Sequence, residues 1–99
     1  MILYNVTVSV DRDIENDWLE WMKTVHILDV INTGMFQTAK VFKLMHVQDE
    51  GATYSIQYFT DSIQKIEQYQ EEFAPALQAE HTERYRDKFV AFRTLMHEA

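Results

Sequence analysis

The sequence predicts an α+β fold with the element order βαββαβ, and the spacing of its apolar residues is the main reason. Along the 99 residues these side chains recur with period two, then 3.6, then two twice, then 3.6 and two again. A chain of this length has room for one hydrophobic core, so we expect a single domain over residues 1–99. The element order is the ferredoxin-like one, with a four-stranded antiparallel sheet and two helices on one face. That arrangement serves unrelated activities and does not name a function.

The first strand is expected from Ile2 to Val10, because its side chains alternate strictly in character. One face carries Ile2, Tyr4, Val6, Val8 and Val10, and the other carries Leu3, Asn5, Thr7 and Ser9. The alternation predicts that the first of these faces is buried.

The first helix should follow at once, with Asp11 and Asp13 as candidate N-caps. It should end at Asn32 and Thr33, with Gly34 in the left-handed position after the last turn. Helical spacing predicts a buried stripe formed by Ile14, Trp18, Trp21, Met22, Val25 and Leu28.

A hairpin is predicted next. Its strands run from Phe36 to Val47 and from Ala52 to Thr60, and they are joined by the turn residues Gln48, Asp49, Glu50 and Gly51. The second of these strands places Ala52, Tyr54, Ile56 and Tyr58 on one face and Thr53, Ser55 and Gln57 on the other.

The second helix is predicted to open at Asp61, because Gln64 three residues later completes a capping-box pattern. Its buried stripe is expected to contain Ile63, Ile66, Phe73 and Leu77. Pro75 predicts a kink or a fresh helical start, because proline cannot donate an interior helical hydrogen bond. Phe89 to His97 should form the last strand.

Charge and composition exclude several classes of function. A net charge of −7 disfavours nucleic acid as a partner, and no apolar run approaches the roughly 18 residues of a membrane span. The chain has no cysteine, which excludes disulfides and thiol catalysis. No signal peptide is visible at the start, so we expect a cytoplasmic protein.

The sheet face away from the helices predicts a homodimer. This face should carry Leu3, Asn5, Thr7, Ser9, Thr53, Ser55, Gln57 and Phe59. A semi-polar face with large apolar members suits face-to-face sheet pairing. The alternative is an open face exposed to solvent.

The chain also resembles a known family over nearly its whole length, in the segments ILYNVTVSVD, WLEWMKTVHILDVINTGMF, TYSIQYF and FAPALQAEHTERYRDKFVAFRTLM. This is an uncharacterised family of small bacterial proteins in the dimeric α/β-barrel superfamily. The resemblance implies a ferredoxin-like protomer that pairs with a second copy, as in cofactor-free monooxygenases and muconolactone-isomerase-like enzymes, and it implies no established reaction. In some enzymatic relatives a proline closely follows the histidine that ends the first helix, whereas here Ile27 and Leu28 follow His26.

Two histidines are the candidate catalytic residues. His81 follows Leu77 by four residues and Phe73 by eight, which places it on the buried stripe, where an imidazole is suited to proton transfer. His26 lies at the edge of the first stripe, beside Met22. The alternatives are a structural core histidine for His81 and a partly exposed residue near the helix end for His26.

Aromatic residues are the candidate ligand-binding side chains. Trp18 and Trp21 share the first stripe, and Tyr54 and Tyr58 join Tyr4 on the inward sheet face. Buried tyrosine hydroxyls need polar partners, so this layer is more polar than a dry core requires and favours a pocket for a small flat ligand. Core packing is the alternative explanation for both tryptophans.

Neither a metal nor a cofactor is predicted. His26, His46, His81 and His97 lie on separate elements without a ligand-spacing motif, and with two glycines the chain has no phosphate-binding or dinucleotide motif. Two hypotheses remain open. The first is a dimeric barrel protein of unknown activity that binds a small apolar or aromatic ligand. The second is a cofactor-free monooxygenase or isomerase that acts on a small cyclic substrate with a histidine general base. A weaker variant of the first is a regulatory module that uses the same pocket.

Overall fold

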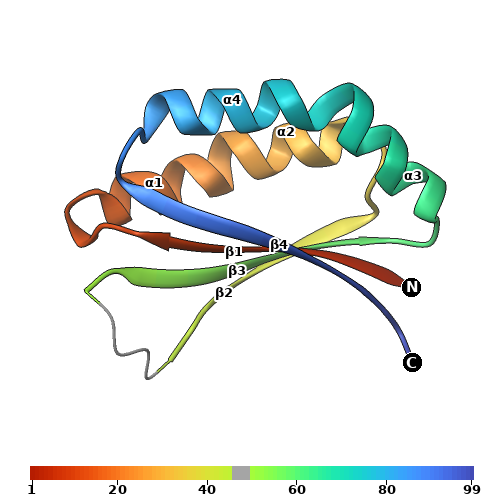
Figure 1. Ribbon diagram of the computed structural model, residues 1–99, viewed down its shortest axis with the longest axis horizontal. Helices are drawn as coiled ribbons and strands as arrows, with labels where there is room; N and C mark the ends of the chain where they lie inside the picture. Colours follow the sequence, from red (N-terminus) through yellow and green to blue (C-terminus); the bar gives the residue numbers. More distant parts are fainter. Residues whose placement is uncertain (46–49) are drawn as a thin grey trace.

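The computed structural model describes residues 1–45 and 50–99, and it confirms the predicted βαββαβ order (Figure 1). Strands β1 (Ile2–Val10), β2 (Thr38–Lys43), β3 (Ala52–Thr60) and β4 (Phe89–His97) form one sheet. The first helix, over residues 12–32, joins η1 (Arg12–Ile14), α1 (Glu15–Trp21), η2 (Met22–His26) and α2 (Ile27–Asn32). The second helix, over residues 63–84, joins α3 (Ile63–Gln68), η3 (Tyr69–Phe73) and α4 (Ala74–Arg84).

The sheet has the strand order β2-β3-β1-β4, and every neighbouring pair is antiparallel. Both helices cover one face of the sheet, and the outer strands β2 and β4 run in crossing directions, as strand twist requires (Figure 1). In the central register Val6 of β1 lies opposite Ile56 of β3 on one side and Arg93 of β4 on the other. This row of side chains faces the helices and forms part of the floor of the site described below.

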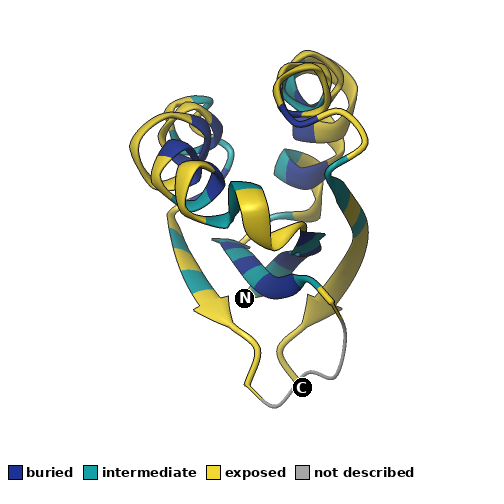
Figure 2. Ribbon diagram, turned by 90° about the vertical axis from the view of Figure 1, so that its left-hand side faces the viewer, coloured by how far each residue is buried: buried dark blue, intermediate teal, exposed yellow. Residues whose placement is uncertain are grey.

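The core lies between the helices and the central strands, as the alternation predicted. Its inward strand residues include Tyr4, Val8, Ile56 and Tyr58, all buried. The outer strands are mostly exposed, and Figure 2 shows this contrast between the edges and the centre of the sheet. Four apolar side chains on the far sheet face are also exposed, namely Phe42, Val90, Phe92 and Met96.

A π-helical turn changes the buried face of the first helix. The backbone N–H of Ile27 donates to the carbonyl of Met22, five residues back, so η2 contains one residue more than an α-helical turn. The prediction that Val25 and Leu28 are buried is therefore wrong, because they are 37% and 51% exposed. His26 takes a buried position in their place.

The second helix also contains a π-helical turn. In η3 the N–H of Ala74 donates to the carbonyl of Tyr69, and Pro75 then occupies the first turn of α4, which confirms the predicted fresh start. Ile63 is 41% exposed, so its predicted burial is wrong. Phe73 and Leu77 are only half-buried, because the shifted phase buries a different set, Tyr69, Ala74, His81 and Tyr85.

Strand β2 is shorter than predicted, since it begins at Thr38 and ends at Lys43. Phe36 leaves the strand because its ring packs in the core, with centroids 5.0 Å from Tyr69 and 5.3 Å from Tyr58. The predicted strand end at Val47 and the turn residues Gln48 and Asp49 lie outside the described residues.

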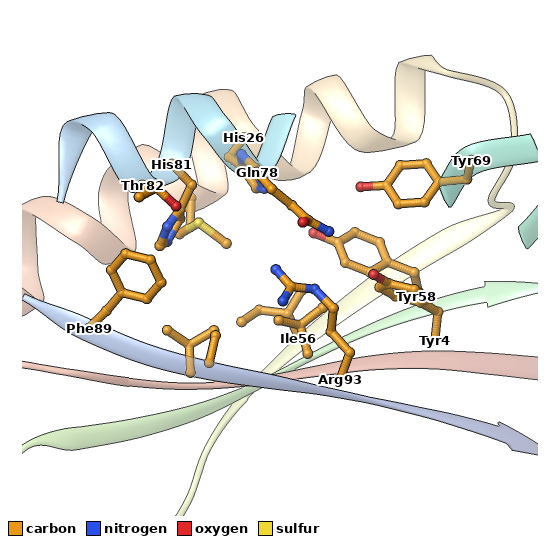
Figure 3. A pocket seen from close by; sticks show the side chains of 14 residues that line it. Tyr4, His26, Ile56, Tyr58, Tyr69, Gln78, His81, Thr82, Phe89 and Arg93 are labelled. Carbon is orange, nitrogen blue, oxygen red and sulfur yellow. The ribbon is translucent and has the colours of Figure 1, made fainter. Parts of the chain in front are cut away.

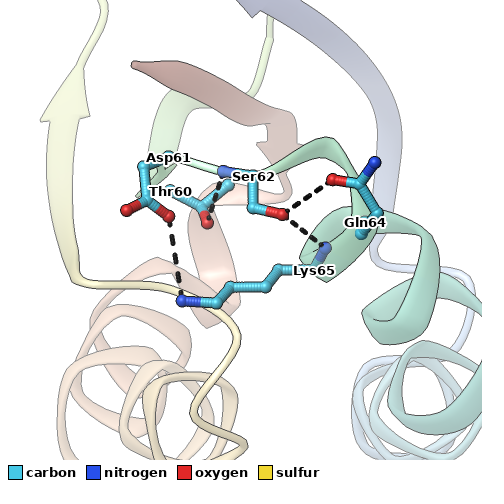
Figure 4. A network of polar contacts seen from close by, with 5 residues as sticks. All are labelled: Thr60, Asp61, Ser62, Gln64 and Lys65. Carbon is cyan, nitrogen blue, oxygen red and sulfur yellow. Dashed lines mark hydrogen bonds and ion pairs between the residues drawn. The ribbon is translucent and has the colours of Figure 1, made fainter.

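The capping predictions need correction at both helix starts. Ser62, not Asp61, is the N-cap of α3: its hydroxyl accepts the Lys65 backbone N–H at 3.4 Å and contacts Gln64 (Figure 4). Asp61 instead pairs with the Lys65 ammonium at 3.7 Å. Asp11 does occupy the N-cap position of η1, as predicted, but its side chain makes no cap bond. The carboxylates of Asp11 and Asp13 pair with Lys88 instead. At the end of the first helix Gly34 has φ +80°, the left-handed conformation predicted for it.

In residues 1–45 and 50–99 no helix combines the length and apolar character needed to cross a membrane. The cytoplasmic location expected from the sequence stays a prediction.

Candidate functional site

A small cavity of about 50 Å³ lies between the sheet and the two helices (Figure 3). It is far smaller than the roughly 150 Å³ engineered cavity that binds benzene, so it has room for water or for the head group of a ligand. Its lining is unusually polar for a space beside a core, and includes Tyr4, His26, Tyr58, Tyr69, His81 and Arg93.

His81 forms the end of the cavity nearest α1 and Phe89. The indole Nε1–H of Trp18 donates to His81 Nε2 at 2.9 Å, and both residues are buried. Because Nε2 accepts this bond, the neutral ring carries its proton on Nδ1. Burial, reinforced by His26 and Arg93, lowers the pKa of His81 to about 4, so the ring is neutral near pH 7.

His26 lies beside His81, with the two ring centroids 5.7 Å apart. Its side chain reaches the cavity because the π turn η2 moves residue 26 to the buried face. Its Nδ1 is buried and has no hydrogen-bond partner in the described part of the chain. Burial is the main cause that lowers the pKa of His26 to about 4. A buried polar atom without a partner calls for water or a ligand in the cavity.

Three tyrosines form the opposite end of the cavity. Tyr4 and Tyr58 come from the central strands, and Tyr69 comes from η3. Burial raises the pKa of all three, so each hydroxyl stays protonated at neutral pH. The Tyr4 hydroxyl also makes polar contacts with Arg93 and Gln78, which partly offset the effect of burial on its pKa.

Sequence reasoning missed four polar lining residues, namely Tyr69, Gln78, Thr82 and Arg93. Tyr69 could have been found, because it follows buried Ile66 by three residues in ordinary helical spacing. Gln78 follows the π turn in η3, which shifts the buried face of the rest of the helix by one residue. Arg93 could have been found: alternation along β4 places it on the same face as Phe89 and Ala91.

Three of the six predicted site residues, His26, Tyr58 and His81, line the cavity together. The other three, Trp18, Trp21 and Tyr54, lie behind the histidines and not in the wall. Trp18 is fully buried, with its ring 5.0 Å from that of Tyr54. Trp21 packs 5.2 Å from the ring of His26. The Tyr54 hydroxyl donates to Glu15 at 2.6 Å, a contact that raises its pKa to about 12 together with the larger effect of burial.

Among the described residues no three His, Cys, Asp or Glu side chains are placed to hold a metal ion. His97 is exposed on β4, and His46 lies outside the described residues.

Fold and cavity define a ferredoxin-like α+β protein with a small polar site under its helices. The chain belongs to the family described as Domain of unknown function (DUF4286), which matches residues 1–99. No curated protein matches the sequence.

Solved structures similar to this chain share its fold at low identity. An ethyl tert-butyl ether d (ethd) family protein from Bacillus halodurans has a TM-score of 0.70 and 10% identity, with 100% of both chains covered. A dimeric ferredoxin-like protein from an uncultured marine organism has a TM-score of 0.67 and 16% identity, covering 100% of this chain and 95% of its own. SnoaB, a cofactor-independent oxygenase from Streptomyces nogalater, has a TM-score of 0.65 and 10% identity, and the match covers 98% of this chain and 92% of SnoaB.

The Trp18–His81 hydrogen bond predicts the stability of His81 variants. We expect His81→Ala to lower the free energy of unfolding by about 1–3 kcal/mol, because it leaves the Trp18 N–H unpaired and opens a void. His81→Gln should lose less, since its amide oxygen can accept the same bond. Urea unfolding of both variants tests this, and equal stability of His81→Ala and wild type would contradict it.

The two histidines also predict a loss of stability in mild acid. In the folded protein both histidines have a pKa of about 4, below the ordinary value of 6.5 that holds in the unfolded chain. Between about pH 4 and pH 6.5 the unfolded chain therefore binds more protons than the folded protein. The stabilisation is complete above about pH 6.5 and is lost as the pH falls towards 4. From about pH 7 to about pH 5 we expect the free energy of unfolding to fall by on the order of 2 kcal/mol per histidine. His26→Leu should show a smaller fall in urea unfolding at these pH values, and an unchanged fall would exclude His26 as a cause.

Proposed function

We propose that the protein binds a small molecule in the cavity between the sheet and the helices. The observation that carries this proposal is the buried Nδ1 of His26, which lacks a protein partner in the described residues. Neutral imidazoles and protonated tyrosine hydroxyls surround the same space, so the site offers both donors and acceptors. Such an arrangement of few polar groups among apolar walls is typical of ligand pockets.

A cofactor-free enzyme, a monooxygenase or isomerase acting on a small cyclic substrate, is the second candidate. The fold shared with a cofactor-independent oxygenase supports it. His81 is a poor general base in this arrangement, because Trp18 already occupies its accepting nitrogen. His26 is the better base, but a pKa of about 4 makes it a weak proton acceptor near pH 7. We therefore rank ligand binding above turnover.

The location of the bound ligand is tested by filling the cavity. Ala91 lines it from β4, and Ala91→Leu adds three carbon atoms to a space of about 50 Å³. We expect the variant to weaken binding of benzamide, a planar probe with a small polar head, by at least tenfold. Binding is measured by NMR titration of the backbone amides and histidine side chains.

Ala39→Leu is the matched control, because Ala39 is on the helix-facing side of β2, opposite Tyr58, and does not line the cavity. It should leave benzamide affinity unchanged. No binding to wild type by either benzamide or benzoate, or equal binding to wild type and Ala91→Leu, would refute the proposal.

We also propose that the protein is a homodimer paired through the sheet face away from the helices. Exposed Phe42, Val90, Phe92 and Met96 rim this face. At its centre the Ser55 hydroxyl donates to Asn5 at 2.6 Å, and the Asn5 amide donates to Thr7 at 2.9 Å. The polar side chains at the centre of this face already have hydrogen-bond partners, and its rim is apolar. The face can therefore pair with a second copy without leaving polar groups unpaired. The fold shared with a dimeric ferredoxin-like protein supports this proposal.

Light scattering after size-exclusion chromatography should give twice the 11.8 kDa chain mass. Ser55→Glu and Phe92→Glu should each shift the protein towards the monomer, because a two-fold interface receives the charge twice. Ala79→Glu adds the same charge on the exposed surface of α4 and should leave the mass unchanged. A monomeric wild type would exclude the dimer, and dimeric Phe92→Glu would exclude this face.

A further inference from the structure

Arg93 occupies an unusual position for a cation. It lies on the edge strand β4, opposite Val6 and between the inward-facing residues Ala91 and Leu95. Its side chain is exposed at the edge of the sheet, and its guanidinium projects into the cavity between the histidines and the tyrosines (Figure 3). An apolar residue would suit this row of the sheet better, so the positive charge needs an explanation.

No ion pair within residues 1–45 and 50–99 includes Arg93. Five other cations pair with carboxylates in that part of the chain, namely Lys43, Lys65, Arg84, Arg86 and Lys88. None of the described residues that line the cavity has a carboxylate. The chain has 16 acidic and nine basic residues, yet within its described part the inward-projecting Arg93 has no anionic side chain as a partner.

The groups facing Arg93 are neutral, and several can donate hydrogen bonds. Three of these groups are tyrosine hydroxyls, from Tyr4 on β1, Tyr58 on β3 and Tyr69 on η3. The second helix contributes Gln78, Thr82 and His81, and the first helix contributes His26. Tyr4, Gln78 and Arg93 line the same space, and both Arg93 and Gln78 are near enough to the Tyr4 hydroxyl to lower its pKa against the larger effect of burial. The positive charge of Arg93 opposes protonation of both histidines, so an anion in the cavity would meet one fixed cation.

We propose that Arg93, with Tyr4 and Gln78, binds the carboxylate of a small organic acid. This inference rests on the proposed ligand-binding function and names its ligand class. A guanidinium presents parallel N–H groups that match the two oxygens of a carboxylate. The cavity of about 50 Å³ fits a head group of this size, and we expect the remainder of the acid to extend past the exposed strand β4.

Benzoate and benzamide test the charge requirement, because they have nearly the same shape and differ in charge. Wild-type protein should bind benzoate at least tenfold more tightly than benzamide, and the NMR signal of the Arg93 side-chain Nε–H should shift on benzoate addition. Arg93→Met keeps an unbranched, flexible stem but removes the guanidinium and its charge. We expect it to lower benzoate affinity at least tenfold and to leave benzamide affinity within twofold.

Lys40→Met is the matched control, because Lys40 lies over the Phe59 ring on the other sheet face. It removes one positive charge from the protein and should change neither affinity. If wild type binds benzamide as tightly as benzoate, or Arg93→Met retains full benzoate affinity, the carboxylate inference fails while ligand binding stands. If neither probe binds wild type, the proposed function and this inference both fail.

Discussion

The hydrogen bond from Trp18 to His81 is the contact on which the arrangement of the site depends. It joins α1 to α4 across a separation of 63 residues, and it is buried at both ends. In such surroundings an unpaired indole N–H would be costly, so the two helices are held in one relative position. The same bond fixes the His81 tautomer and directs its remaining N–H away from Trp18. A single buried polar contact thus sets both the spacing of the helices and the chemistry at one end of the cavity.

One π turn in each helix allows the Trp18–His81 hydrogen bond to form while the rest of the core stays packed. Each helix that covers the sheet contains one, η2 in the first and η3 in the second. Each turn adds one residue and rotates the buried face that follows it. In the first helix this brings His26 to the cavity, and in the second it places His81 beside it. Helical π turns are frequently found at functional sites, and here both adjoin the same small space.

Charge is distributed unevenly around that space. The protein is strongly acidic overall, yet the described residues that line its cavity include an arginine and no carboxylate. Both histidines are neutral near pH 7 because they are buried, and the tyrosines remain protonated for the same reason. Among the described residues that line the cavity, Arg93 therefore has the one formal charge. This separation of charge distinguishes the site from a dry core, and the shared fold of the DUF4286 family does not by itself require it.

Periodicity in the sequence determined the order of the elements and the two faces of the sheet, because these features follow from local backbone geometry. Pro75, which lacks an N–H, indicated a kink or a fresh helical start, and α4 begins there at Ala74. Periodicity also placed His81 on a buried face. Only the tertiary structure decided which helical residues enter the core after Met22 and Tyr69, since π turns break the 3.6-residue period without a recognisable local signal. Likewise, the long-range contacts of Trp18 and Tyr54 took them out of the cavity wall. Helical phase and side-chain pairing across elements depend on packing, and a single sequence contains no direct record of that packing.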